Sequence, residues 1–393
     1  MKNCISQYFN LRYRLFGILY NLLSIVNRFS IHKENKILIY DPDHDKHDNT
    51  GALYDYLVEN GYNQKYIIVH SCRNYKFLRT KAPKNVYFTG KILGIFHFFS
   101  SSFVYYRGST IRIIPSNKQQ VIQMWHGSPC KGAPFVSNKT NWVNPYYTGF
   151  FSASPHFNHI FEKIFSIPKE KMILCGHPRT DDLFKIYPKY PFGEYRKLVI
   201  WTPTFRKYNV KRYGTEKQLL HDDNLLPIVS DKNLKAVNEH LRKIGVKVIV
   251  KLHPMQSLEH YNLVDLDHFI LLSNEEFKSR GMELYRFMTQ CDAMITDYSS
   301  IYWDYLVLDR PIAFTEDDVK EYAQGRGFVM EDPERYKPGP KLFKLEDFYK
   351  FVDDLAEGVD DYKEQRKEMN KYGNPVTDGH NCQRALECVG IFK

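Results

Sequence analysis

The sequence predicts an α/β protein with two domains, each built on a doubly wound parallel sheet. Three observations carry this prediction. A chain of 393 residues is too long for one ordinary hydrophobic core. Short apolar runs typical of buried strands alternate with segments in which apolar residues recur at helical spacing. In both halves, polar residues follow these runs directly, as they do where parallel strands end at a ligand site.

The first half of the chain contains seven apolar runs that predict strands. They lie at 36–40, 66–70, 86–89, 103–106, 121–125, 150–152 and 172–174. Apolar residues at helical spacing predict helices between them, at 52–59, 92–101 and 157–165. Strands that alternate with helices in this way indicate a parallel sheet.

The segment 43–50, between the first strand and the first helix, is rich in charge. Its letters, DHDKHDNT, invite a metal-binding interpretation. The spacing of its histidines and acids fits no standard metal site. We therefore predict a solvated loop beside a ligand cleft.

The second half repeats the alternation. Strands are expected at 198–201, 246–250, 269–272, 293–296 and 311–314. Helices are expected at 234–244, 282–290, 301–308, 345–357 and 361–371. Gly245 ends the first of these helices, and the polar segment 207–224 predicts a loop.

The stretch 293–314 reads as a strand, a polar turn, a helix and a second strand, which is the βαβ unit of a parallel sheet. The turn at 297–300 places two serine hydroxyls and the N–H groups of a helix start at the carboxyl end of a strand. Open α/β sheets bind ligands there, and helix starts favour phosphate. Taken alone, a serine pair in this position is usually only a helix cap.

We expect four parts along the chain. They are an amphipathic helix at 1–33, a Rossmann-like domain at 34–190, a second Rossmann-like domain at 191–375, and a helix at 376–393 that packs back on the first domain. The boundary is placed in the proline- and tyrosine-rich segment 185–196.

The net charge of +10 suggests a polyanionic partner, which would be nucleic acid, an anionic membrane surface or a phosphorylated substrate. The seven cysteines are odd in number, scattered and without CxxC spacing, so we expect reduced residues of an intracellular protein. The composition is globular and excludes a disordered or fibrous chain.

The segment 8–29 carries an apolar stripe at helical spacing, flanked by arginines and free of acids. No run is long enough to span a bilayer, and no small-residue cleavage site indicates a signal peptide. The segment fits either a helix packed on the body of the protein or an interfacial membrane helix. The missing acids and the many aromatic residues favour the membrane.

Polar motifs follow the predicted strands in both halves. In chain order they are QMWHGSP at 123–129, GHPRTD at 176–181, TPTFR at 202–206, KLHP at 251–254, TDYSS at 296–300, DRP at 309–311, DD at 317–318, RG at 326–327 and PGP at 338–340. This ordered set resembles the CDP-glycerol glycerophosphotransferase family of teichoic acid synthesis. The resemblance implies a GT-B fold, in which two Rossmann-like domains, an N-terminal acceptor domain and a C-terminal donor domain, face a central cleft.

The resemblance also implies a reaction: a hydroxyl of a lipid-linked acceptor attacks the β-phosphate of a CDP-activated polyol, and CMP leaves. His126 matches the general base of the family, and an imidazole suits that task near neutral pH. His253 is the second expected catalytic residue. For the phosphates of the donor we expect Arg206, Ser299, Ser300 and Arg326; for its polyol or ribose, Asp297, Asp317 and Asp318; and for the acceptor side, Gly127, Ser128, Arg179 and Asp181.

Some of these roles stay open. Asp297 either organises its turn or contacts hydroxyls of the donor, and Arg179 and Asp181 either shape the acceptor side or fix their own turn. His177 departs from the commoner GxPR pattern of the family, and the residues at 130–132 also differ, but neither change removes a proposed catalytic group. No metal cluster is visible, so histidine and arginine could neutralise the phosphates, although the pattern is also compatible with a loosely bound Mg²⁺.

The expected partners are CDP-glycerol or CDP-ribitol, a lipid-linked glycan or polyol-phosphate acceptor, and the anionic cytoplasmic face of the cell membrane, to which the protein would bind peripherally. No extra domain precedes the two halves, which suggests a short primase-like or capsule-type transferase. The alternative enzyme is a GT-B glycosyltransferase with a nucleotide-sugar donor. A nucleic-acid-binding protein is disfavoured, because the charge is spread and no RNA or DNA module is recognised.

Overall fold

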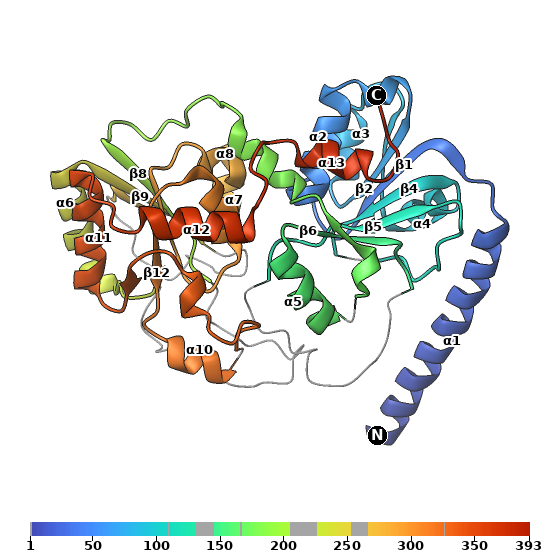
Figure 1. Ribbon diagram of the computed structural model, residues 1–393, viewed down its shortest axis with the longest axis horizontal. Helices are drawn as coiled ribbons and strands as arrows, with labels where there is room; N and C mark the ends of the chain where they lie inside the picture. The colour runs from blue at the N-terminus through green and yellow to red at the C-terminus, as the bar shows by residue number, and fades with distance from the viewer. Residues whose placement is uncertain are drawn as a thin grey trace. The chain divides into compact units, whose positions relative to one another are not determined.

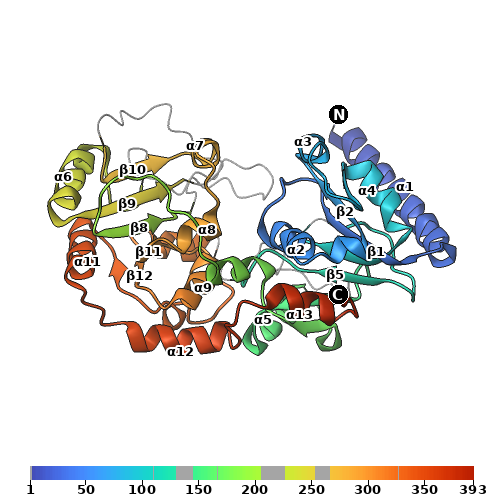
Figure 2. The ribbon, with the colours of Figure 1, turned by 90° about the horizontal axis from the view of Figure 1, so that it is seen from above.

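A computed structural model describes residues 2–108, 110–129, 145–165, 167–204, 226–252, 266–325 and 327–393. The chain forms two compact units (Figures 1 and 2). The first comprises Met1–His126, Thr140–Asp181 and Asp378–Lys393, and the second comprises Gly127–Lys139 and Asp182–Thr377. Each unit contains one sheet with helices, and the predicted α/β class with two Rossmann-like domains is confirmed. The central cleft between them stays a prediction.

The sheet of the first unit has seven strands, all of which pair in parallel, in the order β3-β2-β1-β4-β5-β6-β7. The strands are β1 (Lys33–Asp41), β2 (Ile67–Cys72), β3 (Val86–Thr89), β4 (Ser101–Tyr106), β5 (Gln120–Gln123), β6 (Gly149–Ser152) and β7 (Met172–Leu174). The helices of this unit are α1 (Lys2–Phe29), α2 (Asp48–Glu59), α3 (Tyr75–Arg79), α4 (Lys91–Phe98), α5 (Pro155–Phe165) and α13 (Asn381–Glu387), with short 3₁₀ helices at Tyr62–Gln64, Lys169–Lys171 and Pro178–Phe184.

The sheet of the second unit has six parallel strands in the order β10-β9-β8-β11-β12-β13. The strands are β8 (Lys197–Trp201), β9 (Val246–Lys251), β10 (Phe269–Leu272), β11 (Ala293–Thr296), β12 (Ile312–Thr315) and β13 (Lys341–Leu342). Its helices are α6 (Leu234–Ile244), α7 (Asn274–Ser279), α8 (Leu284–Met288), α9 (Ile301–Tyr305), α10 (Val319–Gly325), α11 (Leu345–Glu357) and α12 (Lys363–Gly373), with 3₁₀ helices at Asp231–Asn233, Leu306–Leu308 and Glu334–Tyr336.

Local sequence explains much of this arrangement. The strands are buried apolar runs, and their side chains join those of the covering helices in one core per unit. In the second core, Trp201 is fully buried and stacks on Phe348 of α11, with ring centroids 5.7 Å apart. The helix predicted at 234–244 is α6, and it ends as predicted at Gly245, whose φ of 71° suits a residue without Cβ.

The two sheets share one topological feature. The strand order reverses between β1 and β4 in the first sheet, and between β8 and β11 in the second. Ligands of open α/β sheets bind outside the carboxyl ends of the strands at such a switch point. The segments that follow these four strands are therefore where a site is expected.

The final helix belongs to the first unit. The chain returns there at Asp378, and the hydroxyl of buried Tyr105 on β4 donates to the carbonyl of Ala385 at 2.9 Å. Figure 1 shows α13 beside α2, far along the chain from it.

Several predicted boundaries were wrong. The strand predicted at 121–125 ends at Gln123, because Trp125 adopts a left-handed backbone with φ 55°. The helix predicted at 301–308 is α-helical only to Tyr305 and ends as a 3₁₀ turn. The solvated loop predicted at 43–50 is wrong in its second half, where α2 begins at Asp48 and both Asn49 and Thr50 are buried.

The predicted N-terminal helix is α1, which runs over 28 residues. Its last turns are attached to the first unit: buried Asn27 donates to the side chain of Gln119 at 2.7 Å, and Ser24 accepts the N–H of Ile114 at 3.0 Å. Within the described part of the chain, no helix combines the length and the hydropathy that crossing a membrane requires.

Candidate active site

The turn after β5 carries the predicted base, His126. Met124 continues the pairing of β5 with β4, donating its N–H to Tyr106 at 2.7 Å, and Trp125 then turns the chain through its left-handed backbone. The Trp125 indole stacks on the His126 imidazole, with ring centroids 4.1 Å apart. A left-handed conformation is costly for a bulky residue, so neighbouring groups must hold the turn in place.

Asn49, at the start of α2, is the first of these groups. Its amide nitrogen donates to the carbonyl of Trp125 at 3.0 Å, and its amide oxygen accepts the N–H of Arg179 at 3.2 Å. Arg179 is buried and donates through Nη1 to the carbonyl of His126 at 3.0 Å. Both carbonyls of the turn are therefore bound by side chains from other parts of the chain.

Asp48 joins two arginines behind this turn. One carboxylate oxygen accepts Nη1 of Arg179 at 2.6 Å, and the other accepts Nε of Arg107 at 2.5 Å. The Asp48 side chain is only 8% exposed. Burial by itself would raise the pKa of Asp48, but the guanidinium groups of Arg179 and Arg107 outweigh it and hold this pKa well below its usual range. The carboxylate is therefore ionised at every physiological pH.

This environment keeps His126 neutral. Burial lowers its pKa to about 4; Arg107 and Arg179 act in the same direction, and Asp48 opposes them. Part of the residue is exposed to solvent, as a base that meets a substrate must be, while the surrounding protein supplies the desolvation. A neutral imidazole at pH 7 has a lone pair free to accept a proton.

The other acceptor-side residues have different surroundings. Gly127 has φ 119° and Ser128 is buried, so both shape the turn directly after His126. Asp181 is buried, and its carboxylate accepts the N–H groups of Asn381 and Cys382 at 2.8 and 2.7 Å. Of the two roles left open for Asp181, these contacts support the structural one, since they cap the start of α13. Arg179 acts on the His126 turn itself.

In the second unit, the turn after β11 is tied to the segment after β8. Asp297 is fully buried, and its two oxygens accept the N–H of Thr204 at 2.6 Å and its hydroxyl at 2.5 Å. These contacts support the alternative in which Asp297 organises the turn, and not the one in which it binds hydroxyls of the donor. Ser299 and Ser300 are half-buried at the start of α9, where Ser300 is the N-cap residue and the Ser299 hydroxyl lies 3.5 Å from the N–H of Ile301.

Aromatic residues pack against Tyr298 in this turn. Tyr298 stacks on Tyr322 with ring centroids 3.9 Å apart, and its hydroxyl donates to Asp318 at 2.7 Å. The ammonium of Lys337, which is ion-paired with buried Glu316, lies 5.3 Å from the Tyr298 ring centroid. Asp318 is thus part of the support of the turn, whereas its predicted partner residue Asp317 is exposed.

The structure brings the predicted residues together in two sets. His126 and Arg179 lie at the carboxyl edge of the first sheet, with Gly127 and Ser128 following His126 in the chain, and Asp297, Ser299, Ser300 and Asp318 lie at the carboxyl edge of the second sheet. Arg206, His253 and Arg326 are outside the described residues. Within the described ranges, no group of three or more histidine, cysteine, aspartate or glutamate residues is placed to hold a metal.

Sequence reasoning missed Asp48, Asn49 and Arg107. One local signal was present, because an acid followed by Asn-Thr directly before an apolar helical pattern is typical of a helix start. That signal gives the position of a helix, not an ion pair with Arg107 and Arg179, which lie 59 and 131 residues further along the chain.

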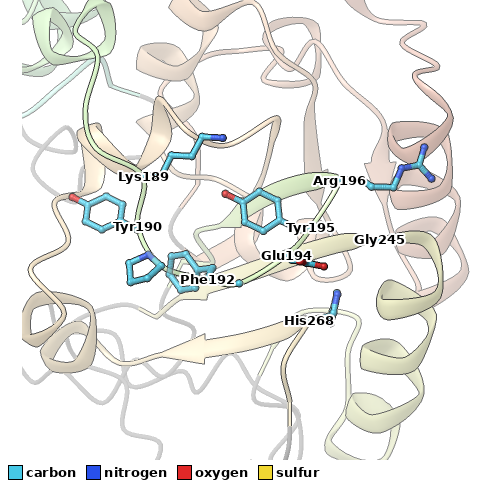
Figure 3. Close-up of a pocket in the computed structure, with 10 residues that line it drawn as sticks. Lys189, Tyr190, Phe192, Glu194, Tyr195, Arg196, Gly245 and His268 are labelled. Carbon is cyan, nitrogen blue, oxygen red and sulfur yellow. The ribbon is translucent and has the colours of Figure 1, made fainter.

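A hollow in the surface of the second unit lies elsewhere. Figure 3 shows it lined by the segment that leads into β8, including Lys189, Tyr195 and Arg196, together with Gly245 and His268. Arg196, Gly245 and His268 directly precede β8, β9 and β10, so the hollow lies at the amino ends of these strands. Ligands of such sheets bind at the carboxyl ends, and we do not assign the active site to this hollow.

Comparison with known proteins gives a consistent result. Residues 22–390 match the family described as CDP-Glycerol:Poly(glycerophosphate) glycerophosphotransferase. The teichoic acid poly(glycerol phosphate) polymerase of Bacillus spizizenii is 25% identical over 366 residues, covering 86% of this chain and 87% of that protein. The teichoic acid glycerol-phosphate transferase of Staphylococcus aureus is 27% identical over 393 residues, covering 91% and 94%.

The fold is also that of a solved relative. The structure of the wall teichoic acid polymerase TagF superimposes with a TM-score of 0.69 at 18% identity, covering 98% of this chain and 97% of that one. A TagF variant soaked with CDPG gives a TM-score of 0.70. These structures establish the GT-B type of fold for this chain.

Proposed function

The chain belongs to the CDP-glycerol:poly(glycerophosphate) glycerophosphotransferase family, and from this premise we propose that it transfers glycerol phosphate or ribitol phosphate from the CDP-activated polyol to a hydroxyl of a lipid-linked acceptor. CMP is the second product, and the acceptor is a precursor of teichoic acid or a related surface polymer. The observation that carries the proposal is the placement of His126 on the turn after β5, next to the switch point of the first sheet, where the buried Asp48–Arg179 pair binds its carbonyl.

The chemistry assigned to this chain is one displacement at phosphorus. The acceptor oxygen forms a bond to the β-phosphorus of the donor while His126 accepts the hydroxyl proton. The bond from that phosphorus to the bridging oxygen breaks, and CMP leaves with the electron pair. The hydroxyls and N–H groups of the Ser299–Ser300 turn would bind the negatively charged phosphates of the donor, because helix starts present unpaired N–H donors.

Arg206, His253 and Arg326 are proposed to share the neutralisation of the donor phosphates, as the family resemblance implies. Proton acceptance and neutralisation of the phosphates are thus both assigned to side chains of this protein. The compatibility with a loosely bound Mg²⁺ is tested by measuring turnover with and without a chelator, followed by re-addition of the ion.

The experiment that tests the proposed function is a donor assay. Purified protein is incubated with CDP-glycerol, CDP-ribitol and a set of UDP-sugars in the presence of a lipid-linked acceptor, and released CMP and UDP are measured. We expect CMP from one or both CDP-polyols and no UDP. Release of UDP from a sugar donor, without CMP from either polyol, would establish the glycosyltransferase alternative instead.

We further propose that the protein binds peripherally to the cytoplasmic face of the cell membrane through α1. The support is a set of exposed apolar side chains on this helix: Phe16, Ile18, Leu19, Leu22, Ile25, Val26 and Phe29. An exposed apolar helix surface on a protein of charge +10 suits an anionic lipid surface.

The membrane proposal is tested by replacing Leu19, Leu22 and Ile25 with glutamate and measuring cosedimentation with vesicles that contain phosphatidylglycerol. Asn27 is left intact, so the attachment of α1 to the unit is preserved. The control replaces the exposed residues Lys363, Lys367 and Lys371 of α12 with alanine, which changes the net charge equally. Equal cosedimentation of the glutamate variant and the wild type would refute the proposal.

A further inference from the structure

We propose that Arg107 binds a phosphate of the acceptor, next to the hydroxyl that His126 activates, so that the preferred acceptor ends in a polyol phosphate and not in an unphosphorylated sugar. This inference rests on the proposed function and narrows its acceptor. Arg107 was not among the residues that the motifs predicted.

The place of Arg107 in the fold is the first argument. It directly follows Tyr106, the last residue of β4, and β4 pairs in register with β5, Tyr106 lying opposite Gln123. His126 follows β5 by three residues, so the guanidinium and the imidazole leave neighbouring strands at the same edge of the sheet. On its other side β4 pairs with β1, which makes this edge the switch point of the unit.

The orientation of the guanidinium is the second argument. Asp48 fixes it through Nε at 2.5 Å, while Asp41 is farther away at 4.0 Å. Among the described residues, no hydrogen bond or ion pair engages Nη1 or Nη2 of Arg107, and the side chain remains 16% exposed. A planar guanidinium held at Nε presents two parallel N–H donors, the geometry that binds phosphate in a bidentate manner.

Arg179 makes the contrast within the same cluster. Its Nη1 is bound by Asp48 and by the carbonyl of His126, so it serves the architecture of the turn. Asp48 is thus shared by one arginine that holds the base and one that keeps a donor edge available. Arg107 is also close enough to His126 to contribute to the lowering of its pKa.

The chemistry of the acceptor is the third argument. In a poly(polyol phosphate) chain, the terminal hydroxyl and the nearest phosphodiester belong to the same short carbon unit. Neighbouring parallel strands are about 4.8 Å apart, so groups that leave them side by side can contact the two ends of such a unit together. A sugar-terminated acceptor offers no anion at that distance from its hydroxyl.

The test compares two acceptors with the wild type and with Arg107→Gln. One acceptor is a lipid that ends in glycerol phosphate, and the other is a lipid-linked disaccharide without polyol phosphate. We expect the wild type to prefer the acceptor that ends in glycerol phosphate. Arg107→Gln should raise the KM for this acceptor at least tenfold, while the KM for CDP-glycerol changes less than twofold. Arg107→Lys should restore this KM only in part, because an ammonium cannot bind phosphate through a planar fork.

Two results would overturn the inference: a wild type that uses the disaccharide acceptor equally well, or a KM in Arg107→Gln that is unchanged or rises equally for both acceptors. Arg112→Gln, an exposed arginine of the same unit, is the matched control and should leave both KM values unchanged. Thermal unfolding of each variant separates loss of binding from loss of fold. A wild type that releases no CMP from any CDP-polyol contradicts the proposed function itself, whereas an active wild type with unaffected Arg107 variants contradicts this inference alone.

Discussion

In the first unit, the segments after the two strands at the switch point are joined by an ion pair between Asp48 and Arg107, whereas in the second unit Asp297 joins them by accepting two hydrogen bonds from Thr204. Both carboxylates have little contact with water. Asp48 is surrounded by guanidinium groups and Asp297 by the N–H and hydroxyl of one residue. At the switch point, the carboxylate is therefore bound by charged guanidinium groups in one unit and by neutral N–H and hydroxyl donors in the other.

The difference follows from what each turn presents. The first turn carries His126, and the ion pairs of Asp48 hold the backbone of this turn through Arg179 and orient Arg107 through its Nε. The second turn is proposed to bind phosphate mainly through N–H and hydroxyl groups, which needs an ordered backbone and no extra side-chain charge. Substitutions in the first turn should therefore act through lost charge, and substitutions in the second turn through lost order of the backbone.

The largest effect is expected from His126→Ala. Loss of a general base typically lowers the rate about 10²- to 10⁴-fold, so transfer from CDP-glycerol should fall by that factor. Because the residue is partly exposed, thermal stability should change little. CMP release and donor binding are measured on the same preparation; turnover equal to the wild type would remove His126 from the mechanism.

The next effect is expected from Asp48→Asn. Removing the charge of Asp48 from this buried ionic cluster takes away the anion that the two guanidinium groups share, which costs about 3–5 kcal/mol of unfolding free energy. The kcat should also fall at least tenfold, since Arg179 then holds the His126 carbonyl less firmly. Asp45→Asn, in the same segment, weakens a surface pair with Arg73 and should cost about 0–1 kcal/mol. Equal effects of the two substitutions in urea unfolding would contradict the buried network.

A smaller effect is expected from Thr204→Val in the second unit. It removes one hydrogen bond to buried Asp297 and should cost about 1–3 kcal/mol. If the turn binds the donor, the KM for CDP-glycerol should rise more than kcat falls, the reverse of the Asp48→Asn pattern. Thr202→Val is the matched control, since its hydroxyl contacts the hydroxyl of Thr296, at 3.2 Å, and not Asp297. A kcat effect without a KM effect would contradict the assignment of this turn to the donor.

The last effect concerns pH and distinguishes the two units through His70. This histidine is fully buried in the first unit, against Phe88 and Tyr54, and burial lowers its pKa to about 3. The unfolded chain takes up the proton near its ordinary value of 6.5 and the folded chain does not, so stability is lost as the pH falls from 6.5 towards 3. The loss is about 1.4 kcal/mol per pH unit.

Hydrogen exchange between pH 7 and 5 would show this loss in the first unit, and His70→Phe should reduce its slope there without changing that of the second unit. An unchanged slope in His70→Phe would show that another group is responsible.

Patterns that act over a few residues determined much of this protein. Apolar runs placed the strands from β1 to β12, Gly245 ended α6, and the ordered motifs by themselves indicated the family. The two-residue strand β13 was missed because it is too short to carry a pattern. The role of Asp297 as organiser of its turn was among the alternatives because its position at a strand end is visible locally.

Tertiary structure alone decided the network around His126. Asp48 lies after β1, Arg107 after β4 and Arg179 after β7, and only the strand order β1-β4-β5-β6-β7 of the folded sheet brings their segments to one edge. The same holds for Asp181, whose partners at Asn381 and Cys382 lie 200 and 201 residues away. Periodicity and capping depend on neighbours in sequence, whereas an ion pair depends on which strands are adjacent, and that adjacency arises only when the whole sheet forms.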